Sequence, residues 1–280
     1  MMRDFSTGSA PIALNTATLG PRASLKDAVD GCLRHGIATL SPWRDRIAAT
    51  GLHAASRLIR DSGLTVAGLC RGGMFPAADA AGRKAVREDN LRALDEAATL
   101  GAGALVLVVG SLPAGSKDIS AARRQVEEGI AALLEDAREF GVRLAIEPLH
   151  PVYAAERACV NTLAQALDMC DRLGGDLGIA IDAYHVWWDP DLSRQIARAG
   201  RSGRILGFHV SDWMLPTASV LNDRGMMGEG IIDLKALRGE VEAAGFAGPV
   251  EVEIFSERNW WMRPVDEILS AVVRACRTAV

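Results

Sequence analysis

The sequence predicts an α/β fold, a single (β/α)8 TIM barrel over residues 1–280 with its active site at the C-terminal ends of the strands. Short apolar runs recur along the whole chain and helix-like segments separate them, which is the order of parallel strands and helices in such folds. The 280 residues suffice for one barrel, which needs roughly 250. No linker or low-complexity tract divides the chain, so we expect one domain.

Eight apolar runs are the candidate strands. Several are nearly continuous in Val, Ile, Leu and Ala, as expected of parallel strands that helices cover. Their number matches the eight strands of a barrel. The runs occupy residues 11–15, 37–43, 64–70, 104–110, 142–148, 177–185, 205–213 and 249–257.

The segments between these runs favour helix. Ser24 is suited to be an N-cap and Gly101 to be a C-cap of two of them. A doubly wound open sheet is the alternative architecture, but no GxGxxG follows the first strand and no GxxxxGK[ST] occurs. The expected helices are residues 24–35, 47–61, 83–100, 119–139, 161–173, 191–200, 233–244 and 264–277.

Charge and cysteine content limit the classes of function. The net charge of -4 and the lack of a basic tract argue against nucleic acid and anionic membranes as partners. Five scattered cysteines without a CxxC pair favour reduced thiols over disulfides or a cysteine zinc site. No uncharged run approaches the ~20 residues of a membrane span, and the N-terminus lacks the apolar core of a signal peptide. We therefore expect a cytoplasmic protein.

Ionisable residues end the last four candidate strands: Glu147, Asp182, His209 and Glu253. Because the C-terminal ends of barrel strands meet at one mouth, we expect these side chains to converge there. A single carboxylate at a strand end more often caps a helix or forms a salt bridge than binds a metal. Together, three carboxylates and one imidazole suit one divalent ion, with Mn²⁺ or Mg²⁺ favoured and Zn²⁺ or Co²⁺ as alternatives.

Strand alternation indicates what lies beneath that ion. Two residues before three of the ligands, on the same inward face, the chain has Ala145, Ala180 and Gly207. The last strand differs, because Glu251 precedes Glu253 on that face. We expect Glu253 to be the ligand and Glu251, one layer deeper, to contribute mainly to stability.

Other residues near the strand ends are candidates for substrate contact. Trp187 and Trp213 predict aromatic walls of a small-molecule pocket, although tryptophans here could instead plug the barrel or form a subunit contact in a homo-oligomer. His185 follows a ligand by three residues and favours substrate contact, whereas His150 could equally be structural. Arg71 could bind an anion or form a salt bridge.

The motifs IEPLHP, IDAYH, FHVSDW, GEGIIDL and GPVEVEIF resemble those of the xylose isomerase-like superfamily of TIM barrels, particularly its sugar phosphate isomerase/epimerase branch. The resemblance is strong over residues 141–257, and the N-terminal half shares only the strand–helix rhythm. It implies a metal held by the four residues at the strand ends, with Glu147 and Glu253 also acting as the acid/base pair. It further implies that His185 and Arg224 contact the substrate.

This resemblance implies an enzyme that isomerises or epimerises a small sugar, sugar phosphate or polyol through a metal-stabilised enediolate. One alternative is an inosose dehydratase-like lyase on the same scaffold, and another is a non-catalytic sugar-binding module. The superfamily also contains a zinc endonuclease, whose site needs more histidines than the five present here. The acidic net charge disfavours DNA as well.

Overall fold

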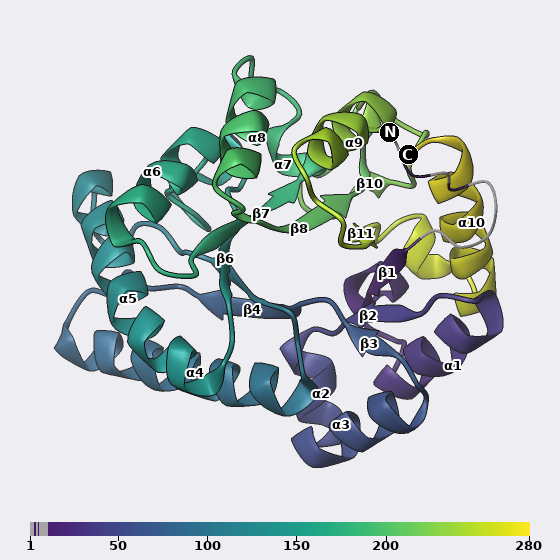
Figure 1. Ribbon diagram of the computed structural model, residues 1–280, viewed down its shortest axis with the longest axis horizontal. Helices are drawn as coiled ribbons and strands as arrows, with labels where there is room; N and C mark the ends of the chain where they lie inside the picture. The colour runs from purple at the N-terminus through teal and green to yellow at the C-terminus, as the bar shows by residue number, and fades with distance from the viewer. Residues whose placement is uncertain (1–2, 4, 6–10) are drawn as a thin grey trace.

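The computed structural model describes residues 3, 5 and 11–280, and its strands form a parallel barrel inside a ring of helices (Figure 1). All neighbours in this nine-stranded sheet are parallel, in the order β3-β2-β1-β11-β8-β7-β6-β5-β4. The predicted TIM barrel is confirmed. The strands are β1 Ile12–Asn15, β2 Thr39–Ser41, β3 Thr65–Val66, β4 Leu69–Gly73, β5 Leu105–Val108, β6 Leu144–Ile146, β7 Gly178–Asp182, β8 Ile205–Val210 and β11 Val250–Val252.

Strands β3 and β4 together form the third strand predicted from the sequence. β3 pairs with β2 on one side, and β4 pairs with β5 on the other. The pairing continues where one strand gives way to the other: Ala67 N, just after β3, donates to Leu40 O at 3.0 Å, and Leu69 N, at the start of β4, donates to Ala104 O at 2.9 Å. The nine strands therefore correspond to the eight crossings of a closed barrel.

Two helical segments differ from the expected pattern. The predicted helix 47–61 is two helices, α2 Arg44–Thr50 and α3 Leu52–Asp61, because Gly51 between them has a φ of 85° that a continuous helix cannot contain. The predicted strand 177–185 ends at Asp182, where a short helix, α7 Ala183–Val186, begins. The Asp182 side chain accepts from Tyr184 N at 2.9 Å and caps this helix.

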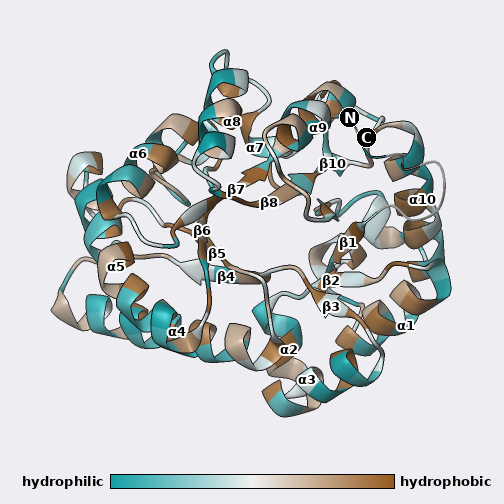
Figure 2. Cartoon of the chain, viewed as in Figure 1, coloured by the Kyte–Doolittle hydropathy of each residue, from teal (hydrophilic) through white to brown (hydrophobic). Residues whose placement is uncertain are grey.

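The remaining helices cover the outer face of the barrel, with hydrophobic residues toward the strands and hydrophilic residues toward solvent (Figure 2). The caps predicted from the sequence are present: Ser24 forms a capping box with Asp27, and Gly101 ends its helix with a φ of 65°. The helices are α1 Leu25–His35, α4 Ala80–Leu100, α5 Ile119–Phe140, α6 Leu163–Leu173, α8 Leu192–Arg201, α9 Leu234–Ala243 and α10 Val265–Thr278, with 3-10 turns η1 Thr16–Leu19, η2 Pro151–Tyr153 and η3 Trp260–Met262.

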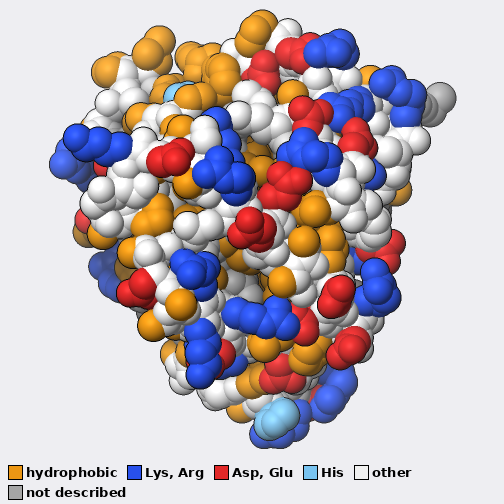
Figure 3. Space-filling view, turned by 90° about the vertical axis from the view of Figure 1, so that its left-hand side faces the viewer, with side chains coloured by type: hydrophobic (Ala, Val, Ile, Leu, Met, Phe, Trp, Pro, Cys, Tyr) orange, Lys and Arg blue, Asp and Glu red, His pale blue; other side chains and the backbone are white. Residues whose placement is uncertain are grey.

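The outer surface carries charges of both signs. On the α5–α6 side of the molecule, Lys and Arg side chains alternate with Asp and Glu (Figure 3). All five cysteines are buried and free. Within the described part of the chain, none of the helices combines the length and the apolar character that crossing a membrane requires.

Candidate metal centre

The four ionisable residues at the strand ends converge at one mouth of the barrel. Glu147 directly follows β6, Asp182 ends β7, His209 lies in β8 and Glu253 directly follows β11. One potential ligand atom from each of them lies within 4.8 Å of the others. All four side chains are buried. The sequence prediction that these residues meet is therefore realised in the fold.

Backbone hydrogen bonds from adjacent strands hold the two glutamates in place. Glu147 N donates to Leu107 O and Glu253 N donates to Val210 O, each at 3.1 Å. The Thr18 hydroxyl braces the chain on both sides of Glu253. It donates to Val252 O at 2.8 Å and accepts from Ile254 N at 3.0 Å. The carboxylates thus rest on the rigid sheet rather than on mobile loops.

The imidazole of His209 lies between two carboxylates. Its Nδ1 is 2.8 Å from Glu147 Oε1, and its Nε2 is 3.5 Å from Glu251 Oε2. Burial alone would lower the pKa of His209, but Glu251 and Glu147 raise it well above its usual value. Either nitrogen can carry a proton, so the ring can present one nitrogen to a metal and donate from the other.

A network of polar side chains holds Glu251. Ser41 Oγ donates to Oε2 of Glu251 at 2.6 Å, and Asn15 Nδ2 donates to Oε1 at 2.7 Å. Asn15 also donates to Glu253 Oε1 at 2.9 Å. Asn15 therefore connects the proposed ligand of β11 to the carboxylate one layer below it.

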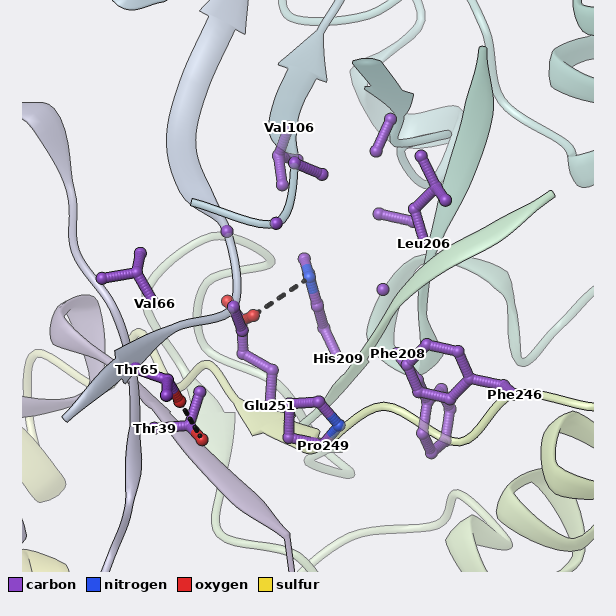
Figure 4. Close-up of a pocket in the computed structure, with 17 residues that line it drawn as sticks. Thr39, Thr65, Val66, Val106, Leu206, Phe208, His209, Phe246, Pro249 and Glu251 are labelled. Atoms are coloured by element: carbon purple, nitrogen blue, oxygen red, sulfur yellow. Dashed lines mark hydrogen bonds and ion pairs between the residues drawn. The ribbon is translucent and has the colours of Figure 1, made fainter. Parts of the chain in front are cut away.

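Small side chains leave the barrel hollow beneath His209, as the sequence predicts. A cavity of about 290 Å³ runs past Ala145, Ala180 and Gly207 toward His209 and Glu251. Figure 4 shows the latter two side chains pointing toward each other in this cavity. A Cβ at Gly207 would lie 3.1 Å from His209 Nε2. A side chain at position 207 would therefore press on the imidazole, which glycine does not.

Buried negative charge makes this cluster suited to a cation. Burial raises the pKa of Asp182 to about 6 and that of Glu253 to about 8, and the charge of Glu147 adds to both increases. Oxygen and imidazole donors of this kind are typical ligands of divalent ions. A divalent ion would neutralise carboxylates that the protein otherwise leaves short of positive charge, so these residues fit a metal.

Arg224 places a positive charge beside the carboxylates of the proposed metal centre. It lies in β10 (Arg224–Gly225), which pairs with β9 (Asp212–Trp213) just after β8. Its Nη1 is 3.1 Å from Asp182 Oδ2 and 3.3 Å from Glu253 Oε2. The guanidinium is 4.4 Å from the Tyr184 ring centroid and 4.8 Å from that of Phe255. It is therefore a rigid, fully desolvated cation beside the proposed ligands.

His185 lies on α7 next to Arg224. Its Nε2 is 3.3 Å from Arg224 Nη2, and its Nδ1 is buried without a hydrogen-bond partner among the described residues. Burial, and next the charge of Arg224, hold the pKa of His185 well below its usual value. The ring is therefore neutral, and its Nδ1 is free to meet a ligand.

A narrow cavity lies over the carboxylates. Arg71, His185 and Arg224, which were expected to contact substrate, are part of its lining. Leu221 and Arg157 also contribute to its walls. The free volume is only about 20 Å³, so a sugar can enter only if lining side chains shift outward.

Three other candidates for substrate contact lie outside this cavity. His150, Trp187 and Trp213 are not among its described lining residues; the Trp213 ring packs against the rings of His150 and Trp187. Trp213 stacks on Tyr184 with a centroid separation of 4.8 Å. Trp43, at the end of β2, is the tryptophan that lines the cavity instead. Substrate contact by the three residues remains a prediction without support from the cavity.

Sequence reasoning missed four residues at this site. Asn15 and Ser41 end β1 and β2, so their signal was the same as that of the ligands: a polar residue at a strand end. The predicted ligands, however, all come from the last four strands. Tyr153 ends η2 and Arg157 lies in the loop that follows, so neither stands at the end of a strand.

A model of the family described as xylose isomerase-like TIM barrel matches residues 29–277. The chain belongs to this family. Inosose isomerase of Halalkalibacterium halodurans is 26% identical over 153 residues, which are 53% of this chain and 52% of that relative. The chain thus spans about half the length of this curated relative.

Solved structures show the same barrel. The crystal structure of protein SMc04130 from Sinorhizobium meliloti 1021 has 59% identity and a TM-score of 0.95, covering 96% of this chain and 98% of that chain. The IOLI protein, crystallised with a bound zinc atom, has 20% identity and a TM-score of 0.82, covering 95% and 96% of the two chains. At the latter identity the likeness concerns the fold alone.

Proposed function

We propose that the protein is a divalent-metal-dependent isomerase or epimerase of a small sugar, sugar phosphate or polyol. The observation that carries the proposal is the convergence of Glu147, Asp182, His209 and Glu253 within 4.8 Å at the C-terminal ends of barrel strands. Membership of the xylose isomerase-like family supports it. So do a curated relative that is an inosose isomerase and a structural neighbour that binds zinc.

The four residues would hold one divalent ion, with Mn²⁺ or Mg²⁺ best suited to three carboxylates and one imidazole. Such an ion supplies Lewis acidity toward a carbonyl and an adjacent hydroxyl of the substrate. The proton transfers are then left to the protein's own side chains.

Glu147 and Glu253 are the proposed acid/base pair. Their strands, β6 and β11, are separated in the sheet by β7 and β8, so the two carboxylates reach the centre from different sides. One removes the proton from the carbon next to the carbonyl, and the other returns a proton. Return to the opposite face of the same carbon gives an epimer, whereas return to the neighbouring carbon interconverts aldose and ketose.

Arg224 and His185 are the proposed contacts to the substrate oxygens. Arg224 is a buried, permanently charged donor, and Nδ1 of His185, in the cavity wall, has no hydrogen-bond partner among the described residues. Donors fixed before the reaction stabilise negative charge as it develops on the enediolate oxygens. Their buried position also excludes water from the reacting carbon.

Deuterium exchange tests this function. Protein loaded with Mn²⁺ is incubated in deuterated water with a panel of ketoses, keto-polyols and their phosphates. We expect metal-dependent incorporation of deuterium at the carbon next to the carbonyl, with a product that differs from the substrate in configuration or carbonyl position. A product lighter by one water would instead identify a lyase. Absence of exchange with every member of the panel, with metal bound, would rule out the proposal.

A further inference from the structure

Besides Arg224, two arginines lie among the residues that line this narrow cavity. Arg71 lies in β4 and Arg157 in the loop between η2 and α6, and both line the cavity above the proposed ligands. Within the described ranges neither guanidinium forms a hydrogen bond or ion pair; Arg157 only lies over the Tyr153 ring, 5.6 Å from its centroid. Both side chains are half-buried.

A neighbouring arginine shows how this region normally satisfies such a charge. Arg44, at the start of α2, is 2.9 Å from Asp89 and 2.6 Å from Glu96. Arg71 lies close to this network, yet it turns to the cavity rather than to those carboxylates. Burial, followed by the charge of Arg157, lowers the pKa of Arg71. Two like charges therefore adjoin each other at the cavity rim, which costs free energy unless an anion joins them.

Two neutral donors belong to residues that line the same cavity as the arginines. Tyr153 Oη and Trp43 Nε1 are both buried, and neither has a hydrogen-bond partner among the residues that the structure describes. Both residues line the cavity. A buried donor without a partner costs about 1–3 kcal/mol, so these groups indicate a ligand rich in acceptor oxygens.

The two ends of the cavity thus differ in charge. Glu147 and Glu253 are almost fully buried and, with the proposed metal, would form the floor of the cavity, whereas Arg71 and Arg157 are half-buried and so lie nearer to solvent, at its rim. We infer that the substrate carries an oxyanion group, a phosphate or a carboxylate, which Arg71 and Arg157 bind while its carbonyl end faces the floor. This inference rests on the proposed function. Arginine suits the task because its planar fork of donors matches both oxyanions.

Anion binding by the metal-free protein provides the first test. Calorimetric titration with inorganic phosphate and with acetate, in the presence of a chelator, measures affinity for the wild type and for Arg71→Met, Arg157→Met and the double variant. We expect each substitution to weaken binding of the preferred anion roughly tenfold or more, the effect of losing one charged hydrogen bond. Arg57→Met, which removes an exposed charge on α3, should leave this affinity unchanged.

Measuring turnover provides the second test, and it also shows whether the substrate carries a phosphate or a carboxylate. Each neutral ketose is compared with its phosphate ester and with its keto-acid counterpart. We expect kcat/KM to favour one anionic form, and the double variant to lose that preference through KM. Arg71 lies in a barrel strand, so Arg71→Met could fail to fold. Arg157 lies in a loop, and Arg157→Met then carries the test alone.

Two outcomes would overturn the inference: wild-type anion affinity equal to that of the double variant, or neutral ketoses processed as well as their anionic counterparts. The second outcome would leave the proposed function intact. Failure of the proposed function looks different, because no sugar would then exchange deuterium, while the phosphate and acetate titrations would still decide whether the arginines form an anion site.

Discussion

The Nε2 atom of His209 lies 3.5 Å from Oε2 of Glu251, while Nδ1 of the same ring faces Glu147 at 2.8 Å. A histidine that binds metal through one nitrogen usually donates from the other to a carboxylate, which fixes the orientation of the ring. Glu251 occupies that place, and Ser41 and Asn15 hold it there. We therefore propose that Glu251 also orients His209, in addition to the stabilising role expected from the sequence.

Glu251→Gln is expected to weaken metal binding. The amide keeps the shape of the side chain but removes the negative charge that orients and polarises His209, a change that typically costs about 10–100-fold in metal affinity. Titration calorimetry with Mn²⁺ measures the effect, and Glu139→Gln on the exposed surface of α5 is the control. Equal affinity in wild type and Glu251→Gln would return Glu251 to a purely structural role.

His209→Ala is expected to lower the affinity for the metal by roughly tenfold or more, because one of four ligands is lost. Metal analysis after dialysis, together with calorimetry, measures stoichiometry and affinity. His53→Ala removes an exposed histidine of α3 and serves as the control. Unchanged binding by the His209 variant would remove this residue from the ligand set.

Glu147→Gln and Glu253→Gln are expected to retain metal, though more weakly, because the amide still offers an oxygen. The chemical step should fall by ~10² to 10⁴-fold, the usual contribution of a general base. One of the two variants should still exchange the substrate proton with deuterated solvent without completing epimerisation. The glutamate that remains in that variant is then the base, and the substituted glutamate is the acid for the second face. Near wild-type rates in both variants would contradict the two-carboxylate mechanism, leaving a base such as His185 to be considered.

The pH dependence of metal-free stability should report the buried carboxylate of Glu253. Its pKa is raised to about 8 in the folded protein from an ordinary value of 4.5. The folded state therefore holds a proton that the unfolded state releases, so the free energy of unfolding should fall as pH rises between these two values. Glu253→Gln should lack this contribution, which makes the difference between the two proteins the observable.

Urea unfolding of both proteins at several pH values, with chelator present, measures that difference. The wild type should lose stability relative to Glu253→Gln as pH rises, and saturating Mn²⁺ should reverse the loss by neutralising the carboxylates. A difference that stays constant with pH would show that Glu253 is not protonated in the folded metal-free protein.

The barrel and the convergence of Glu147, Asp182, His209 and Glu253 followed from sequence because both depend on local pattern. Parallel strands bring their C-terminal ends together whatever the loops do, so a polar residue at each strand end locates the site. The place of Trp213 could not be read from the sequence in the same way. It belongs to β9, after β8, where pairing with β10 rather than the alternation of a barrel strand sets the direction of its side chain. Loop residues such as Arg157 reach the cavity only through tertiary packing.

Anomalous X-ray diffraction from crystals grown with Mn²⁺ tests the central claim most directly, since it locates the metal without reference to activity. We predict one manganese peak per chain, within coordination distance of Glu147, Asp182, His209 and Glu253. A peak bound elsewhere, or no peak in protein saturated with Mn²⁺, would contradict the metal centre and with it the proposed reaction.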